Sequence, residues 1–151
     1  MRICADEHVS PEIVRLVHEI ALSPGWELSH VFDGGWGGTD DVVWITRFAR
    51  NGGQALLTAD KDFIKRHHQV LAVCDTGLRV VHMPKKWANE RRRMQAAHIL
   101  FWWNQIEAAL SNSAPRQCYK VPWSFTDSSL GPIKLDFENA RRKIKKAERR
   151  A

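Results

Sequence analysis

The stretch of sequence that decides the fold is Leu56-Leu57-Thr58-Ala59-Asp60-Lys61-Asp62-Phe63. Its apolar beginning is typical of the end of a buried strand, and two carboxylates, Asp60 and Asp62, follow directly. The N-terminus shows the same pattern, because Ile3-Cys4-Ala5 leads straight into Asp6-Glu7. In an open parallel α/β sheet, ligands bind at the carboxyl ends of the strands. We therefore expect the two acidic strand ends to be neighbours in space and to form a functional site.

Apolar periodicity predicts strands and helices that alternate along the chain. A first strand, a helix with Ser10 as its cap and a second strand form a βαβ unit, which requires a right-handed crossover between parallel strands. The expected strands are residues 2–5, 26–32, 54–58, 78–83 and 117–121, the last at an edge. The expected helices run from Ser10 to Pro24, from a Thr39 cap to Asn51, and over 60–68, 88–110 and 135–150. The sequence thus predicts an α/β fold with a central, mainly parallel sheet.

The composition fits one domain with a substantial core, since the 151 residues are 44% hydrophobic and include seven tryptophans. No apolar run is long enough to span a bilayer, and no signal peptide precedes the first acids. We therefore expect no membrane partner. The cysteines, Cys4, Cys74 and Cys118, are odd in number and show neither a paired metal spacing nor a disulfide framework. We expect reduced thiols and a cytoplasmic location.

Basic residues are unevenly placed. The net charge is +6, and residues 140–151, with seven lysines or arginines against Glu148 alone, account for the whole excess. Further clusters are Lys85-Lys86 and Arg91-Arg92-Arg93. Such clusters suit a polyanionic partner. For the C-terminal tail, a solvated helix face or a disordered segment is an equally good interpretation.

Five acids are expected at one end of the sheet, after the first strand, at the start of the second helix and after the third strand: Asp6, Glu7, Asp40, Asp60 and Asp62. Clustered carboxylates repel one another, and a divalent cation resolves the repulsion. Oxygen ligands favour Mg²⁺ or Mn²⁺ over zinc. Such a site can activate a water against a phosphodiester, with one metal or two.

Each acid also has a simpler interpretation. Asp40 and its neighbour Asp41 would stabilise a helix N-terminus. Asp60 would cap the helix that follows it, and Asp6-Glu7 would form a turn before Ser10. The three places taken together favour a functional site, from which Asp41 is left out.

Other side chains carry weaker signals. Lys61 lies between two proposed ligands and could contact a phosphate or stay solvated. His8 could touch substrate, whereas His67-His68 is more typical of a surface. The Trp102-Trp103 pair is more typical of a core than of a platform for base stacking.

Three blocks of the sequence resemble the PIN-like domain proteins: residues 3–11, 38–44 and 56–63. They occur in the order and spacing of that family and cover about residues 1–84, with the "T-A-D-K-D-F" block as the most specific. The resemblance implies a PIN fold, a three-layer sandwich with a Mg²⁺- or Mn²⁺-dependent acidic site. It implies an endoribonuclease, often the toxin of a toxin–antitoxin pair, and a possible homodimer. We expect the PIN-like domain to span residues 1–134 and a basic C-terminal helix or tail to span 135–151.

The resemblance also assigns roles to residues. Asp6 corresponds to the first metal ligand, Asp40 to the second acid and Asp60 to the third, with Asp62 completing the site. Glu7 would bind metal through water. The residues expected to bind RNA are Lys61, Lys85, Lys86, Arg91, Arg92, Arg93, Arg141, Arg142, Lys145 and Lys146.

Two alternatives stay open at this stage. The chain could be a non-catalytic RNA- or partner-binding protein on a PIN scaffold. It could also be a receiver-like domain. Such domains need a lysine after a late strand, and Lys85-Lys86 is only a loose match to it.

Overall fold

The structure is a computed structural model that describes residues 1–151. Six strands form a single sheet in the order β2-β1-β3-β4-β5-β6. The strands are β1 (Arg2–Ala5), β2 (Glu27–His30), β3 (Ala55–Thr58), β4 (Arg79–His82), β5 (Cys118–Lys120) and β6 (Gly131–Ile133). All neighbouring pairs are parallel except β5 and β6, which are antiparallel. The predicted α/β fold with a mainly parallel sheet is therefore confirmed.

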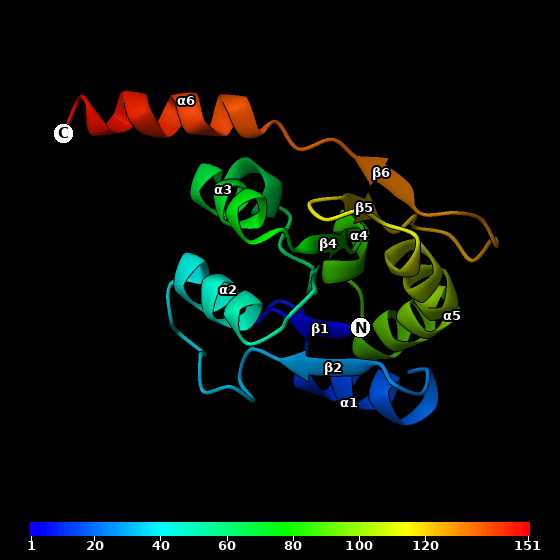
Figure 1. Ribbon diagram of the computed structural model, residues 1–151. Coiled ribbons are helices and arrows are strands. Elements are labelled where there is room, and N and C mark those ends of the chain that lie inside the picture. The colour runs from blue at the N-terminus through cyan, green and yellow to red at the C-terminus, as the bar shows by residue number, and fades with distance from the viewer.

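Helices cover both faces of the sheet (Figure 1). They are α1 (Pro11–Ile20), α2 (Asp41–Arg50), α3 (His67–Thr76), α4 (Lys85–Ala88), α5 (Arg92–Ser111) and α6 (Phe137–Glu148), with a short 3-10 helix, η1 (Phe63–Lys65). α1 and α5 pack on one face, and α2 and α3 pack on the other. The result is the expected three-layer sandwich.

The local sequence explains the first βαβ unit. Ser10 Oγ accepts a hydrogen bond from Glu12 N at 3.1 Å, and Pro11 occupies the first turn of α1. Ile13 and Val17, one turn apart, face the sheet and are buried. Every residue of β3 is buried because this strand lies in the middle of the sheet with helices on both sides.

Three tryptophans fill the core between α5 and the sheet. Trp87, Trp102 and Trp103 are 0% exposed. The prediction that the Trp102-Trp103 pair belongs to the core is confirmed, since neither ring is accessible to a nucleic-acid base.

Three predicted boundaries are corrected by the structure. Residues 117–121 do not form the edge strand, because β6 pairs with β5 on its outer side. The helix predicted over 60–68 is a turn, the short η1 and the start of α3, since the Asp60 carboxylate accepts from Asp62 N and closes a turn. The cap of α2 is Asp40 rather than Thr39, because the Asp40 Oδ1 atom accepts from Val42 N at 3.0 Å.

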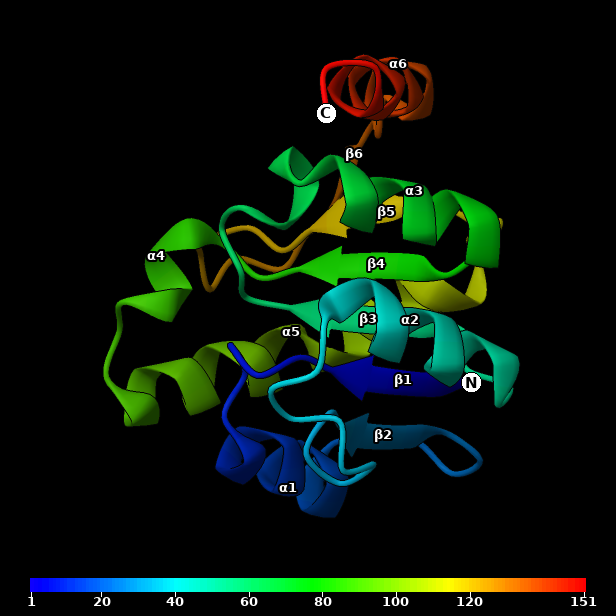
Figure 2. The ribbon, with the colours of Figure 1, turned by 90° about the vertical axis from the view of Figure 1, so that its left-hand side faces the viewer.

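The C-terminal helix lies beside α3, on the side away from the sheet (Figures 1 and 2). Asp136 caps it by accepting from Asn139 N, and Ala140 is buried at the contact. The Arg141 guanidinium also lies 3.5 Å from the Cys74 sulfur of α3. The boundary expected between residues 134 and 135 falls in the segment that joins β6 to α6.

None of the helices has both the length and the apolar content that crossing a membrane requires.

His98, on α5, is expected to make stability depend on pH. Burial lowers its pKa, and the hydrogen bond between Nε2 and the Pro122 carbonyl oxygen, at 2.9 Å, opposes this only in part. Its other ring nitrogen, Nδ1, is buried without a partner, and its ring stacks on Trp123. The folded protein therefore favours neutral His98 more strongly than the unfolded chain, in which a histidine takes up its proton near pH 6.5. The lowered pKa of His98 therefore adds stability above about pH 6.5, and this stability is lost as the pH falls from there through the pKa of the folded state.

We expect the wild-type protein to lose more unfolding free energy between about pH 7 and pH 5 than the His98→Asn variant. Urea unfolding at each pH, followed by circular dichroism, measures the difference. Parallel pH curves for the two proteins would contradict the prediction.

Candidate active site

The acidic strand ends meet at the carboxyl edge of the sheet, as the sequence predicts. β1 and β3 are adjacent and parallel, with Ala5 opposite Leu57. Asp6 follows β1 directly, and its backbone N donates to Leu57 O at 3.0 Å. In Figure 2 the arrowheads of the parallel strands point to this edge, which also carries α4 and the first turns of α1 and α5.

Asp6 and Asp60 are the two buried carboxylates of this edge, with 6% and 5% of their surface exposed. Thr58 joins them, because its hydroxyl donates to Asp6 Oδ2 and accepts from Asp60 N at 3.0 Å. The remaining Oδ1 atom of Asp6 accepts from His8 N at 3.0 Å. Asp60 Oδ1 accepts from Asp62 N at the same distance. Three of these hydrogen bonds reach carboxylate oxygens, two on Asp6 and one on Asp60, and the fourth links Thr58 to the backbone of Asp60.

Arg66 supplies the positive charge next to this pair. Its Nη1 atom lies 2.7 Å from Asp60 Oδ2 and 3.7 Å from Asp41 Oδ2. A carboxylate as buried as Asp60 needs such a partner, because desolvation of an unpaired charge costs several kcal/mol. Asp41 is anchored in turn by Trp44 Nε1, which donates at 2.9 Å, and by the amide of Gln69.

His8 lies on the other side of Asp6. Its Nδ1 atom is 3.8 Å from Asp6 Oδ2, and its side chain is about half exposed. The neighbouring Asp6 carboxylate raises the pKa of His8; the charges of Asp60 and Glu7 act in the same direction, and partial burial opposes them. His8 is therefore placed where it can meet a substrate, as considered from the sequence.

The structure does not gather the other predicted acids around this pair. Asp40 is exposed and caps α2. Glu7 is exposed. Asp62 is bound by Lys65 Nζ at 3.0 Å, and this contact lowers the pKa of Asp62. No group of three or more His, Cys, Asp or Glu side chains is placed to hold a metal ion.

The Asp6–Asp60 pair nevertheless fits a divalent cation of the hard type. Mg²⁺ is commonly held in proteins by one or two carboxylates, with waters and substrate phosphates completing its coordination. Asp6 and Asp60 follow adjacent strands, and Thr58 links the Asp6 carboxylate to the backbone N–H of Asp60. Asp6 has no cationic partner apart from His8. Asp6 and Asp60 are the residues that would hold the ion.

Sequence reasoning missed Thr58 and Arg66 and left out Asp41. Thr58 stands in the quoted stretch, but a strand-end threonine carries no chemical signature by itself. Arg66 lay inside a predicted helix, so nothing indicated that its side chain turns back to Asp60.

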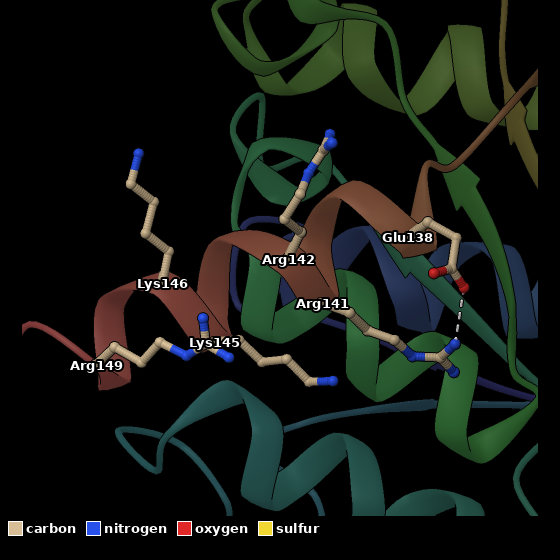
Figure 3. A pocket seen from close by; sticks show the side chains of 6 residues that line it. All are labelled: Glu138, Arg141, Arg142, Lys145, Lys146 and Arg149. Carbon is tan, nitrogen blue, oxygen red and sulfur yellow. Dashed lines mark hydrogen bonds and ion pairs between the residues drawn. The ribbon is translucent and has the colours of Figure 1, made fainter.

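The predicted RNA-binding residues lie in two places. One group lies at the carboxyl edge: Lys61, Lys85 and Lys86 follow strands, and Arg91–Arg93 lie at the start of α5. There, Arg92 Nη1 lies 3.7 Å from Glu12 Oε2 of α1. The others line a cavity of about 470 Å³ along α6 (Figure 3). They are Arg141, Arg142, Lys145 and Lys146, joined by Glu138 and Arg149.

The fold and the edge together define an α/β protein with a candidate acidic site at the carboxyl ends of β1 and β3. The family model of the PIN-like domain matches residues 1–85, more than half of the chain. The chain belongs to the PIN-like domain family. PIN-like domains are generally nucleases and typically use divalent metals. No curated protein and no solved structure matches the chain.

Arg66 is expected to compete with a metal ion for Asp60. In EDTA, the Arg66→Met variant should be less stable than the wild type by about 1–3 kcal/mol, because a buried carboxylate loses its partner. Mn²⁺ should then raise the unfolding temperature of Arg66→Met more than that of the wild type, since a ligand that binds only the folded state stabilises it.

Thermal unfolding with EDTA or Mn²⁺ measures both effects. Arg47→Met is the matched control, because Arg47 is exposed on α2 and forms no ion pair. An equal Mn²⁺ shift in all three proteins would show that Arg66 and the metal do not share Asp60.

Proposed function

We propose that this PIN-like domain is a Mg²⁺- or Mn²⁺-dependent endoribonuclease that hydrolyses RNA phosphodiesters. The observation that carries the proposal is the pair of buried carboxylates, Asp6 and Asp60, at the carboxyl edge, where Thr58 links the Asp6 carboxylate to the backbone of Asp60. Nucleases of this family generally work with divalent metals, and this pair offers the oxygen ligands that such metals prefer.

Each residue of the edge has a part in the proposal. A bound Mg²⁺ or Mn²⁺ supplies a Lewis acid for the phosphate and lowers the pKa of a water. Asp6 and Asp60 would hold the ion, and Thr58 would orient the Asp6 carboxylate and link it to the backbone of Asp60. Glu7 and Asp62, which adjoin the pair in sequence, are proposed to act through water. Lys86, Arg91–Arg93 and the basic residues of α6 hold the RNA backbone, which gives affinity without sequence preference.

We further propose that the chain is the toxin of a type II toxin–antitoxin module and acts in the cytoplasm. The support is the resemblance of three sequence blocks to small PIN-like proteins, in which this role is frequent. A cognate antitoxin protein is the partner that this role implies, and a second copy of the chain is a further proposed partner.

One observation favours a second function, a non-catalytic RNA- or partner-binding protein on a PIN scaffold. Fewer than three metal-binding side chains converge, and Arg66 already neutralises Asp60. A scaffold that had lost catalysis would keep such an ion pair and the basic surface.

RNA cleavage with different metals separates the two functions. The purified chain is incubated with a pool of single-stranded and hairpin RNAs in Mg²⁺, in Mn²⁺ or in EDTA. Cutting that requires either metal is the expected result. RNA binding without cutting in all three conditions would overturn the nuclease and favour the scaffold.

A further inference from the structure

Beside the acidic pair, a pocket of about 370 Å³ opens at the carboxyl ends of β4 and β5. Its polar lining consists of Lys61, Lys65, Lys85, Lys120, His82 and Asp62. The register explains why these residues meet, since Thr58 lies opposite His82 and His82 lies opposite Lys120 across parallel strands. The carboxyl edge is therefore acidic over β1 and β3 and basic over β4 and β5.

The lysines reach the pocket from four different parts of the chain. Lys61 follows β3, Lys65 ends η1, Lys85 begins α4 and Lys120 ends β5. Their convergence is therefore a product of the fold and not of a basic run in the sequence.

Only one of these charges is balanced within the protein. Lys65 Nζ lies 3.0 Å from Asp62, whereas Lys61, Lys85 and Lys120 form no ion pair. Ammonium groups that line one cavity repel one another, and an anion that enters the cavity relieves the repulsion. The pocket thus favours an anionic group.

The pocket lies beside the candidate catalytic residues, and His82 connects the two. The His82 ring lines it, and His82 Nε2 lies 2.8 Å from the carbonyl oxygen of Asp60. Lys61 separates Asp60 from Asp62 in sequence and also lines the pocket. A group bound here is therefore a near neighbour of the Asp6–Asp60 pair.

We propose that this pocket binds the terminal phosphate of an RNA strand. A terminal phosphate monoester carries a charge of about −1.5 to −2 at neutral pH, which matches three unpaired lysines better than the single charge of an internal phosphodiester does. If the proposed nuclease function holds, the location next to Asp60 means that cutting falls a short, fixed distance from a phosphorylated end. The binding itself requires no catalysis.

The test measures binding in EDTA, where the proposed cleavage cannot occur. Three short RNAs of one sequence carry the same internal fluorophore and differ only in their ends: a 5′-phosphate, a 3′-phosphate, or hydroxyl groups at both ends. Fluorescence anisotropy gives each affinity. We expect one phosphorylated RNA to bind the wild type about tenfold more tightly than the RNA with hydroxyl ends, since hydrogen bonds to charged groups are worth about 1.5–3 kcal/mol each.

The double variant Lys85→Gln, Lys120→Gln should reduce this preference to less than about twofold, because it removes two of the three unpaired charges. Both side chains are exposed, so the fold should survive, and thermal unfolding checks this. The control variant Lys134→Gln removes a lysine that lines a different cavity and should keep the preference.

Two results would overturn the proposal. Equal binding of all three RNAs by the wild type would show that the pocket recognises no terminal phosphate. Equal weakening of all three RNAs in the double variant would show that the pocket holds consecutive internal phosphates instead. A protein that fails to cleave RNA can still show the preference, and a protein that cleaves can lack it, so this test and the test of the proposed function fail independently.

Discussion

The Asp60→Asn variant is expected to lose metal-dependent RNA cleavage by about 10³-fold while it keeps its fold. A metal that polarises a phosphoryl oxygen contributes several kcal/mol to the transition state, and each 1.4 kcal/mol corresponds to a factor of ten in rate. Asparagine retains a side-chain oxygen that can accept from Asp62 N, so the turn after β3 can persist. It lacks the negative charge that would hold the ion opposite Asp6.

Initial rates of RNA cleavage in Mn²⁺ measure the effect, and circular dichroism and thermal unfolding show whether the variant is folded. Asp75→Asn is the matched control, because Asp75 is an exposed carboxylate of α3 without an ion pair. The control should cleave at the wild-type rate. Full activity in a folded Asp60→Asn protein would remove Asp60, and with it the proposed site, from the reaction.

Much of the sheet could be predicted from the sequence because parallel strands between helices follow simple rules. Short apolar runs at Ile3-Cys4-Ala5 and Ala55-Leu56-Leu57 indicate two buried strands, and the helix between the first two strands requires parallel pairing. Once both strands are parallel and adjacent, Asp6 and Asp60 must leave the sheet at the same edge. The structure confirms the strands and this meeting.

The other features of this edge could not be predicted, because they depend on tertiary contacts that leave no periodic pattern in the sequence. β6 contains Gly131 and Pro132, which are both unfavourable in strands, and it pairs only because the chain folds back onto β5. Arg66 reaches Asp60 because the backbone turns after Asp62 instead of continuing as a helix. Residues that act through such long-range contacts cannot be found from spacing alone.

The sequence also could not show which of two adjacent acids, Asp40 or Asp41, contacts the site. The resemblance assigns the second acid to Asp40, whereas the structure ties Asp41 to Asp60 through Arg66. Both carboxylates lie at the start of α2, but the two adjacent residues have different contacts. Asp40 Oδ1 accepts from Val42 N and closes the first turn of the helix. Asp41 instead turns toward α3, where Gln69 donates to it.

We therefore expect Asp41→Asn to lower RNA cleavage by about 10–100-fold, the usual cost of removing a group that orients a metal ligand. The variant leaves the Arg66 guanidinium with Asp60 as its only anionic partner, so Arg66 should compete more strongly with a metal ion. Asp40→Asn should change the rate less than about twofold, because asparagine caps a helix as well as aspartate does.

The two variants are each other's control, since they make the same chemical change at adjacent positions and alter the net charge equally. Cleavage rates in Mn²⁺, normalised to the folded fraction from thermal unfolding, give the comparison. The opposite order, with Asp40→Asn as the slower enzyme, would mean that the first turn of α2 rearranges when the metal and RNA bind. In that case Asp40 would be the second acid that the family resemblance implies, and the contact of Asp41 with Arg66 would belong to the metal-free state.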